Sequence, residues 1–485
     1  MKIILGPPGT GKTTSLIRII EEKLSQGVDP RRIAFVSFTR KGAYEARDRV
    51  MEKFGLTQDQ LPFFKTLHSI AYNYPGDERY KILEDDHWDD LTRLLGMKFT
   101  GKMSTEEMPT KGANLGDRFV FLINFARSSL IPLKRVWSLY GEGIDWYELK
   151  LVSDTIERYK KEKRLVDFTD IIESFVKGDH SLPVDIGIID EAQDNSALQW
   201  DMVKSAFQGA KELFIAGDDD QSIFKWAGAD IDTFLKLKGD ISVLSQSYRL
   251  PKAVYDLSMK VSSKIKNRFA KKFSPRDEKG SVNFHNYIDY VDLDNGESWI
   301  CLARNRYFLK QVEEQIRRQG LSYSTIYGSS VIKDHMLAIY GWENIRRGKT
   351  ISRADSELIG KFSGFHPINR KKETFDKSDF KEFKDVPWFD VFFRMSFNDK
   401  EYYKAILRKG GNLRTAPKIH VNTIHGVKGG EADNVLILTD LSYKTWQSLE
   451  RNPDDEHRVF YVGITRARKN LHIVLPQSNL FYDFS

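Results

Sequence analysis

The sequence contains a single cysteine, Cys301, among its 485 residues. One cysteine excludes an intramolecular disulfide and any zinc cluster built on cysteines, and it is typical of a reducing compartment. No apolar run approaches the ~18 residues that a membrane-spanning helix requires. The chain also reaches Gly6 and two prolines before a signal peptide's apolar core can form. These absences favour a cytoplasmic protein.

The composition is that of a globular protein with a slight excess of positive charge. Hydrophobic residues make up 40% of the chain, too large a share for a disordered one. Lys and Arg number 75 against 68 Asp and Glu, a formal net charge of +7, which permits a polyanionic partner. At roughly 150 residues per domain, the length predicts about three packed units. Composition alone indicates no activity.

Short apolar runs rich in β-branched residues alternate with amphipathic stretches along most of the chain. Such runs are typical of strands buried on both faces of a parallel sheet. The alternation predicts an α/β fold with two doubly wound parallel sheets. The expected strands are residues 2–5, 33–38, 184–190, 212–217 and 241–245 in the first sheet, and 281–287, 299–303, 418–423, 434–439 and 470–475 in the second.

Two long polar stretches, of about 75–165 and 334–415, interrupt this alternation and are expected to be mainly helical insertions. We detect no fixed-period repeat and no low-complexity linker. The predicted organisation is a first α/β domain over 1–74 and 166–279, interrupted by the insertion 75–165, and a second over 280–333 and 416–485, interrupted by the shorter insertion 334–415.

Residues 6–13 read GPPGTGKT and satisfy the P-loop pattern for binding phosphate, with an expected strand before them and a helix after them. The glycines let backbone N–H groups converge on phosphate oxygens, and the helix N-terminus adds positive potential. Lys12 is expected to neutralise the β- and γ-phosphates, and the Thr13 hydroxyl to ligate Mg²⁺. The predicted nucleotide-binding residues of this loop are Gly6, Pro7, Pro8, Gly9, Thr10, Gly11, Lys12, Thr13 and Thr14.

An apolar strand ends in the carboxylate pair Asp190 and Glu191. Asp190 is expected to hold the magnesium ion through its hydration shell, and Glu191 to orient and deprotonate the attacking water. By itself, such a pair is more often the cap of the following helix. A P-loop in the same chain favours the catalytic interpretation.

Phosphoryl transfer also needs positive charge at the transition state. Arg249 and Arg466 are expected to supply it. Arg466 belongs to the predicted second α/β domain, which has no P-loop, so the expectation is that ATP binds between the domains and that hydrolysis changes their separation. An exposed surface position is the default alternative for either arginine.

Taken together, these motifs resemble superfamily 1A DNA helicases of the UvrD/Rep/PcrA branch, in a compact form. The series of segments runs in family order almost from the first residue to the last: 6–13, 35–41, 66–69, 190–194, 217–226, 247–249, 423–431 and 461–467. A single member could arise by chance, whereas the ordered series is specific. The resemblance implies that both α/β domains are RecA-like.

The resemblance also implies roles for residues around the nucleotide. Gln221 would sense the γ-phosphate and link it to the DNA track. Tyr248 would stack on the adenine, and Glu431 would contact the ribose. Arg249 and Arg466 would be two arginine fingers, in agreement with the charge argument.

A single-stranded DNA track is implied as well, with eight contact residues: Phe38, Thr39, His68, Phe224, Trp226, Arg304, Thr423 and His425. Stacking of a base on an aromatic ring is worth roughly 1–3 kcal/mol and tolerates any sequence. Core packing is the competing interpretation for Phe38 and Phe224, while Trp226 is expected to be exposed. The basic clusters at 158–164 and 264–272 could either follow phosphates or form solvated helix faces.

The sequence departs from the family pattern at four points. The P-loop strand begins at Met1, without the upstream glutamine segment that reads adenine, so a relaxed nucleotide preference is expected. The insertion 334–415 is shorter than the regulatory subdomain of relatives. The chain stops at Ser485, so the strand-separating hairpin is expected to be short or absent. Ala227 follows Trp226, where an arginine is usual. Duplex unwinding is therefore a weaker expectation than movement along DNA.

The function predicted from the sequence is an ATP- and Mg²⁺-dependent DNA helicase that moves along single-stranded DNA and unwinds duplexes, with the 3′→5′ polarity that the resemblance to the UvrD-like branch implies. It would bind single strands and duplex junctions as a monomer, beside replication or repair proteins, in the cytoplasm of a bacterium or of a phage's host. One alternative is a translocase that strips proteins from DNA without unwinding. Another is a P-loop kinase or nucleotide switch, although Arg249, Arg466 and segment 221–226 speak against it. Because stacking reads no 2′-hydroxyl, an RNA track also stays open.

Overall fold

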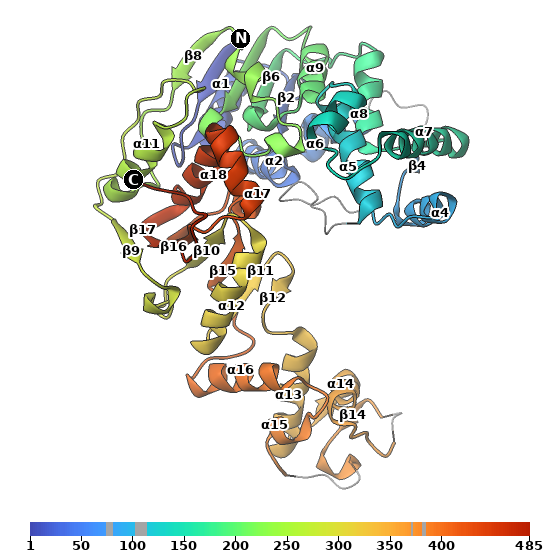
Figure 1. Cartoon of the computed structure of the whole chain (residues 1–485), viewed down its shortest axis with the longest axis vertical. Coiled ribbons are helices and arrows are strands. Elements are labelled where there is room, and N and C mark those ends of the chain that lie inside the picture. Colours follow the sequence, from blue (N-terminus) through green and yellow to red (C-terminus); the bar gives the residue numbers. More distant parts are fainter. Residues whose placement is uncertain (74–80, 102–113, 370–371, 381–384) are drawn as a thin grey trace. The chain divides into compact units, whose positions relative to one another are not determined.

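The computed structural model describes residues 1–73, 81–101, 114–369, 372–380 and 385–485. The chain divides into two compact units, the first comprising 1–280 and 447–465 and the second 281–446 and 466–485. Each unit is built around a sheet of mainly parallel strands with helices beside it (Figure 1). The predicted fold class, two doubly wound α/β sheets with mainly helical insertions, is confirmed. The expected boundary at 74/75 lies outside the described residues.

The sheet of the first unit has six parallel strands in the order β3-β2-β6-β7-β1-β8. The strands are β1 (Lys2–Leu5), β2 (Ile33–Ser37), β3 (Phe64–Lys65), β6 (Ile186–Asp190), β7 (Glu212–Gly217) and β8 (Asp240–Val243). Because all run the same way, the loops that follow them lie along one edge of the sheet. That edge carries the P-loop after β1 and Glu191 after β6.

Helices cover both faces of this sheet, which is why its central strands are continuous apolar runs. Ile4, Leu16 and Ile188 belong to one buried cluster, and Ile3, Ile189 and Trp200 to another. The helices are α1 (Lys12–Ser25), α2 (Arg40–Phe54), α3 (Leu67–Tyr72), α8 (Phe168–Lys177), α9 (Ala197–Ala206), α10 (Ile231–Leu235), α11 (Lys252–Ser262) and α18 (Pro453–Ile464). Helix α18 belongs to this first unit and packs against α11.

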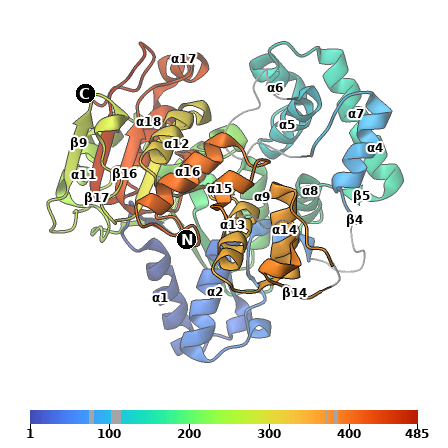
Figure 2. The ribbon, with the colours of Figure 1, turned by 90° about the horizontal axis from the view of Figure 1, so that it is seen from below.

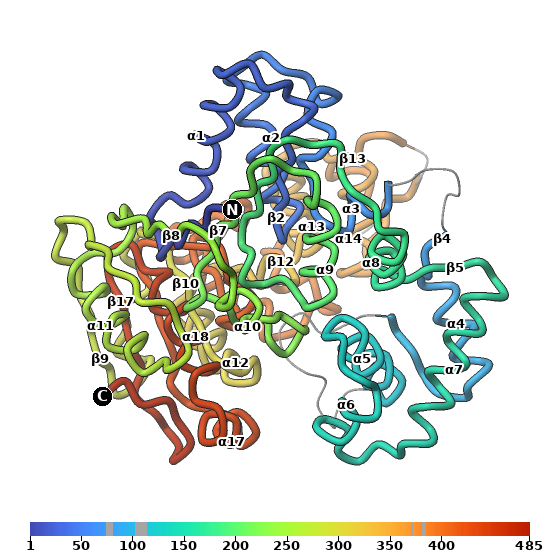
Figure 3. Tube along the Cα trace, turned by 90° about the horizontal axis from the view of Figure 1, so that it is seen from above, coloured from blue at the N-terminus to red at the C-terminus, as the bar shows by residue number. Residues whose placement is uncertain are grey.

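The insertion in the first unit is a separate group of helices, visible together in Figures 2 and 3. It comprises α4 (Asp85–Leu95), α5 (Leu115–Ser128), α6 (Leu133–Tyr140) and α7 (Trp146–Lys163), with the short strands β4 (Lys81–Ile82) and β5 (Leu165–Val166) paired beside them. These helices have their own core around Leu91, Phe119 and Leu149. In the basic cluster 158–164, Lys160 points inward to Asp167 and Asp170, while its neighbours on the polar face stay in solvent.

The sheet of the second unit has the order β12-β11-β15-β10-β16-β17-β9, and only the pair β11–β12 is antiparallel. Its strands are β9 (Ser281–His285), β10 (Trp299–Ala303), β11 (Tyr323–Thr325), β12 (Gly328–Ser329), β15 (Ile419–Thr423), β16 (Ala432–Leu438) and β17 (Ala467–Val474), accompanied by α12 (Leu309–Arg318). Helix α17 (Tyr443–Arg451) begins in this unit and continues into the first. Cys301 is buried in this sheet, and burial raises the pKa of its thiol to about 12.

The insertion in the second unit is also mainly helical and has its own core around Trp342, Ile359 and Phe392. Its elements lie together in Figure 2. They are α13 (Lys333–Arg346), β13 (Ile351–Ser352), α14 (Arg353–Ser363), β14 (Thr374–Phe375), α15 (Trp388–Val391) and α16 (Phe397–Arg408). None of the helices that the structure describes combines the length and apolarity needed to cross a membrane.

Candidate nucleotide site and DNA-contacting residues

The P-loop turns from β1 into α1 through two glycines in the left-handed region. Gly9 has φ +72° and Gly11, the N-cap of α1, has φ +75°, which side chains other than glycine adopt only with strain. A Cβ on Gly9 would lie only 2.3 Å from the Cβ of Arg249. Glycine is therefore required here both for the backbone conformation and for the close approach of Arg249.

The segment 247–249 is tied to the P-loop by two hydrogen bonds. The Ser247 hydroxyl donates to the carbonyl of Pro8 at 2.7 Å, and the Tyr248 N–H donates to the carbonyl of Gly9 at 2.8 Å. The Tyr248 ring is 73% exposed, so it is accessible to a planar ligand such as a nucleobase. These contacts bring the predicted Tyr248 and Arg249 to the phosphate loop, about 240 residues away in sequence from Pro8.

Thr13 and Asp190, the predicted magnesium ligands, lie next to each other. The Thr13 hydroxyl donates to Asp190 Oδ2 at 3.0 Å. Burial raises the pKa of Asp190 to about 6, so a nearby cation would strongly favour its ionised form. A hydroxyl and a carboxylate at a phosphate loop fit Mg²⁺, which takes few protein ligands and completes its shell with water and phosphate oxygens. Among the described residues, no cluster of three or more carboxylate, imidazole or thiol groups offers a rival metal site.

Lys12 and Glu191, the predicted phosphate ligand and general base, form an ion pair with an Nζ–Oε1 distance of 2.6 Å. Burial alone would lower the pKa of Lys12, but Glu191 and Asp190 outweigh it and the pKa is raised. Glu191 has φ +53°, a conformation that costs on the order of 1–3 kcal/mol for a residue other than glycine. In this conformation the Glu191 carboxylate contacts the P-loop lysine.

A residue that the sequence analysis missed connects this carboxylate to Gln221. Gln193 is fully buried; its Nε2 donates to Glu191 Oε2 at 2.6 Å, and its Oε1 accepts from the Asp218 N–H at 3.0 Å. Asp218 in turn accepts from Gln221 Nε2 at 2.6 Å. The only available sequence signal was the position of Gln193 inside the segment 190–194. The structure thus joins the predicted base and the predicted γ-phosphate sensor through two intermediate residues, Gln193 and Asp218.

Three of the predicted DNA-contacting aromatics form a row in the first unit. Phe38 and Phe224 stack with ring centroids 5.8 Å apart, and Phe224 meets Trp226 edge to face at 6.5 Å. Phe38 is 38% exposed, so core packing is the wrong interpretation for it. Trp226 is half-buried because it packs against the helical core of the first insertion, which corrects the expectation that it is exposed.

Thr39 and His68 lie in the same unit as this row. Thr39 caps α2, since its hydroxyl accepts from the Gly42 N–H at 3.1 Å. The His68 ring stands edge-on to Phe168, with centroids 6.1 Å apart. Burial and the nearby Arg40 lower the pKa of His68. His68 is therefore neutral near pH 7 and would contact DNA through a hydrogen bond rather than a charge.

The remaining predicted residues belong to the second unit. Arg304 follows β10, and Thr423 is the last residue of the neighbouring parallel strand β15. Both residues therefore lie at the same edge of that sheet. Thr423 and His425 are buried, and Glu431 is exposed with its carboxylate 3.6 Å from Arg468. Arg466 is buried as well, and its Nη1 donates to the carbonyl of Gly430 at 3.3 Å. The P-loop group and this group thus belong to different compact units.

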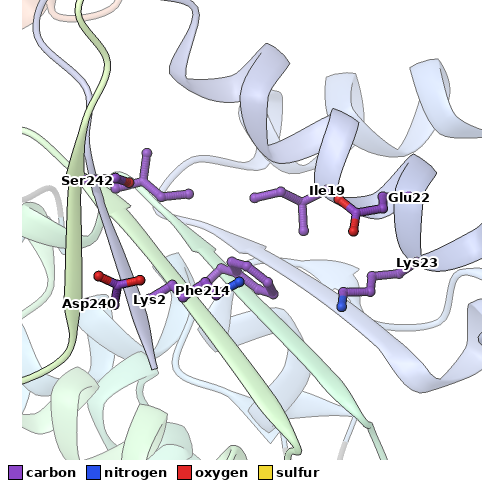
Figure 4. A pocket seen from close by; sticks show the side chains of 8 residues that line it. Lys2, Ile19, Glu22, Lys23, Phe214, Asp240 and Ser242 are labelled. Atoms are coloured by element: carbon purple, nitrogen blue, oxygen red, sulfur yellow. The ribbon is translucent and has the colours of Figure 1, made fainter.

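A small cavity of about 220 Å³ lies between α1 and strands β1, β7 and β8 (Figure 4). Lys2 and Asp240 line it at the amino ends of their strands, whereas the P-loop follows the carboxyl end of β1. The nucleotide site predicted from the motifs is therefore not this cavity.

The fold and the P-loop geometry define a nucleoside-triphosphate-binding protein of the P-loop class. Comparisons with known proteins give the family. The model of the UvrD/REP helicase N-terminal domain matches residues 2–242, and that of the UvrD-like helicase C-terminal domain matches residues 418–474. Together the two matches span more than half of the chain. The chain belongs to the UvrD/Rep family of DNA helicases.

Individual relatives are distant in sequence. The ATP-dependent DNA helicase PcrA of Bacillus subtilis is 24% identical over 363 residues, which cover 69% of this chain but 47% of PcrA. A probable DNA helicase of Mycoplasma pneumoniae is 23% identical over 522 residues, covering 100% of this chain and 82% of the relative. The ATP-dependent DNA helicase Rep of Buchnera aphidicola is 24% identical over 251 residues, 49% of this chain and 38% of Rep. The match thus spans about half the length of PcrA.

Proposed function

We propose that this protein is an ATP-dependent DNA helicase that moves 3′→5′ along single-stranded DNA and unwinds duplexes. The observation that carries the proposal is the pairing of Lys12 with Glu191 and of Thr13 with Asp190 at one sheet edge, in the same unit as the aromatic row of Phe38, Phe224 and Trp226. The names of the relatives agree with ATP-driven action on DNA. The polarity follows from the UvrD-like resemblance alone.

The ion pair between Lys12 and Glu191 suggests how nucleotide binding would free the general base. Phosphate oxygens of ATP would compete with Glu191 for the ammonium, because Lys12 is the P-loop lysine. Glu191 is then released to accept a proton from water. Mg²⁺ held by Thr13 and Asp190 would neutralise charge on the phosphates. Without nucleotide, the general base Glu191 stays paired with Lys12.

The proposed roles of the two arginines follow from their motifs and charge. Arg249 already lies against Gly9 of the P-loop, where its guanidinium can meet negative charge that develops on the γ-phosphate. Arg466 is proposed as the second finger. Tyr248 is proposed to stack on the nucleobase and Glu431 to contact the ribose.

The connection from nucleotide to DNA runs through the segment after β7. Gln221 is joined to Glu191 through Gln193 and Asp218, and the same segment continues to Phe224 and Trp226. A change at the γ-phosphate would therefore shift two rings proposed to stack on bases. Because stacking on each base is worth roughly 1–3 kcal/mol, such a shift can release one base and bind the next.

Unwinding of tailed duplexes tests this function directly. A fluorescently labelled duplex with a 3′ single-stranded tail should separate when ATP and Mg²⁺ are added, and one with a 5′ tail should not. The Lys12→Ala variant should separate neither. Equal activity on both tails would contradict the polarity, and no separation of either would contradict unwinding.

A translocase that strips proteins from DNA without unwinding is the second candidate, and Ala227, at a position where family members usually carry arginine, favours it. The discriminating assay uses a forked duplex with streptavidin bound to a biotin on its 3′ tail. Release of streptavidin while the duplex stays paired, with ATP consumed, would support stripping alone. Separation of the strands would support the helicase.

A further inference from the structure

Three consecutive carboxylates follow β7, and all three side chains are buried in the first unit. Asp218, Asp219 and Asp220 would repel one another and lose hydration without cations beside them. Lys271 supplies one cation, with its Nζ 2.6 Å from Asp218, 2.5 Å from Asp219 and 2.9 Å from Asp220, and its side chain is fully buried. Arg268 supplies another through its Nε, 2.8 Å from Asp220 Oδ1. Both interpretations of the basic cluster 264–272, phosphate tracking and a solvated face, are therefore wrong for Lys271.

The same carboxylates fix the turn that positions Gln221. Asp218 Oδ2 accepts from Gln221 Nε2 at 2.6 Å, and Asp219 Oδ2 accepts from the Phe269 N–H at 2.9 Å. Burial would lower the pKa of Lys271, but the three carboxylates outweigh it and the pKa is raised. Lys271 thus stays charged, and the turn cannot move without breaking charge-assisted hydrogen bonds.

Helix α18 is held to this turn by a further cation, the buried Arg458. Arg458 is 2% exposed; its Nε donates to the carbonyl of Asp219 at 3.0 Å and its Nη2 to the carbonyl of Asn267 at 2.5 Å. At the start of the helix, the Asp454 carboxylate accepts from the N–H groups of Lys266 and Asn267, both at 3.0 Å. The turn, the segment 266–271 and α18 are therefore held together by polar contacts, of which the hydrogen bond from Arg458 to the Asp219 carbonyl is buried and those of Asp454 are exposed.

The other end of α18 contacts Arg249, which lies beside the P-loop. Thr465, the C-cap of the helix, offers its carbonyl to Arg249 Nη1 at 3.3 Å, and Arg249 lies against Gly9. In the chain, Arg466 follows Thr465 directly. Helix α18 thus contacts the turn that holds Gln221 near one end and a proposed arginine finger at the other.

We propose that Arg458 and Lys271 are positioning residues that hold the turn 218–221 and α18 rigidly together. A displacement of Gln221 then moves α18, and through it Arg249 and Arg466. The inference rests on the proposed function, because that function assigns the γ-phosphate to Gln221. Neither Arg458 nor Lys271 touches the nucleotide in this account, so both act on turnover rather than on nucleotide affinity.

Hydrogen exchange with and without a non-hydrolysable ATP analogue tests the coupling without DNA. In the wild type, residues 218–226 and 453–464 should both exchange at least fivefold more slowly when the analogue binds. In Arg458→Lys, which can reach only one of the two carbonyls, 218–226 should slow and 453–464 should not. Slowing of both segments in the variant, or of neither in the wild type, would overturn the inference. Coupled exchange without DNA-stimulated hydrolysis would instead count against the proposed function and support the coupling.

Steady-state kinetics separate positioning from simple support of the fold. Arg458→Lys should lower kcat at least tenfold, with the KM for ATP within twofold and the Tm nearly unchanged. The matched control is Arg32→Lys, at the amino ends of β2 and β6. Arg32 also donates two hydrogen bonds, from its Nε and Nη2 to the Asp185 carboxylate at 2.5 and 2.8 Å. The control should keep kcat within twofold. A kcat within twofold of the wild type in Arg458→Lys, or a loss that only follows the loss of folded protein, would overturn the proposal.

Lys271 needs a variant that keeps the charge balance. Lys271→Met alone leaves three buried carboxylates beside one arginine and can prevent folding. The double variant Asp219→Asn/Lys271→Met removes one charge of each sign. It should fold, lose at least tenfold in kcat and show uncoupled exchange. Wild-type kcat in the folded double variant would overturn the role of Lys271.

Discussion

The two units contain similar sheets, but only the first has a phosphate-binding loop. In both, central parallel strands are buried, and loops gather at their carboxyl ends. In the first unit, β1 leads into the P-loop and β6 into Asp190 and Glu191. In the second, Arg304 follows β10 and Thr423 ends β15, and the described residues after these strands form no P-loop. The sheets thus supply the scaffold, while short loop sequences determine which one binds the nucleotide.

The units also contain different clusters of titratable side chains. The first unit buries full charges, with Lys271 among three aspartates beside the site. The second unit packs His285 against His472, with ring nitrogens 3.0 Å apart, next to Trp299. Burial lowers the pKa of both imidazoles, that of His472 to about 4. The stability of the second unit should therefore depend on pH in the mildly acidic range.

The largest expected effect comes from removing the P-loop lysine. Lys12→Ala should reduce ATP hydrolysis at least 100-fold, equivalent to about 2.7 kcal/mol of transition-state stabilisation, because the β- and γ-phosphates lose the ammonium that the P-loop holds against them. Lys469→Ala removes an exposed lysine that pairs with Glu297 in the second unit and should change the rate less than twofold. Retention of more than a tenth of the activity in Lys12→Ala would contradict the assignment of the site to the first sheet.

Glu191→Gln should separate binding from chemistry. We expect kcat to fall about 100-fold through loss of the general base, while ATP binds as tightly as before or more tightly, because Lys12 loses its competing carboxylate. The control Glu212→Gln breaks a lysine pair with Lys23 in the same unit and should leave kcat unchanged. Fluorescent nucleotide binding and single-turnover hydrolysis measure the two quantities. Weaker binding together with normal turnover is the contrary result.

Phe38→Ala should weaken single-stranded DNA binding by roughly 1–3 kcal/mol, which is about 5- to 150-fold in Kd. The ring is exposed and stacked on Phe224, so its removal should leave the ATPase activity without DNA unchanged. Phe284→Ala removes an exposed phenylalanine of β9 in the second unit and serves as the control. Fluorescence anisotropy with labelled oligonucleotides gives both affinities. Equal affinity for the wild type and Phe38→Ala would remove Phe38 from the track.

The smallest expected effect concerns the histidine pair. The unfolded chain protonates His472 near pH 6.5, whereas the folded pKa is about 4, so stability falls as pH decreases from about 6.5 toward 4. Partial exposure limits the loss to on the order of 1 kcal/mol. Thermal unfolding at pH 7 and 4.5 should show a smaller decrease in Tm for His472→Gln than for the wild type. An identical decrease would show that the pair does not contribute.

The sequence predicted the parts of the molecule that depend on local patterns. Continuous apolar runs placed the strands within a few residues, and GPPGTGKT located the P-loop. The burial of Lys271 was not predicted because its carboxylate partners begin 53 residues earlier in the chain. The sequence of a basic cluster does not indicate which of its lysines is buried. The half-burial of Trp226 was not predicted for the same reason, because it packs against the helical core of the first insertion. Gln193 was missed because its link to Asp218 joins residues 25 positions apart.

The most direct test of the central claim is the rate of ATP hydrolysis by the full chain with and without single-stranded DNA. We expect a saturating oligonucleotide to raise kcat at least tenfold, because Glu191 and the aromatic row are joined through Gln193, Asp218 and Gln221. Hydrolysis at the same rate with and without DNA would contradict a phosphate site that drives movement along a strand.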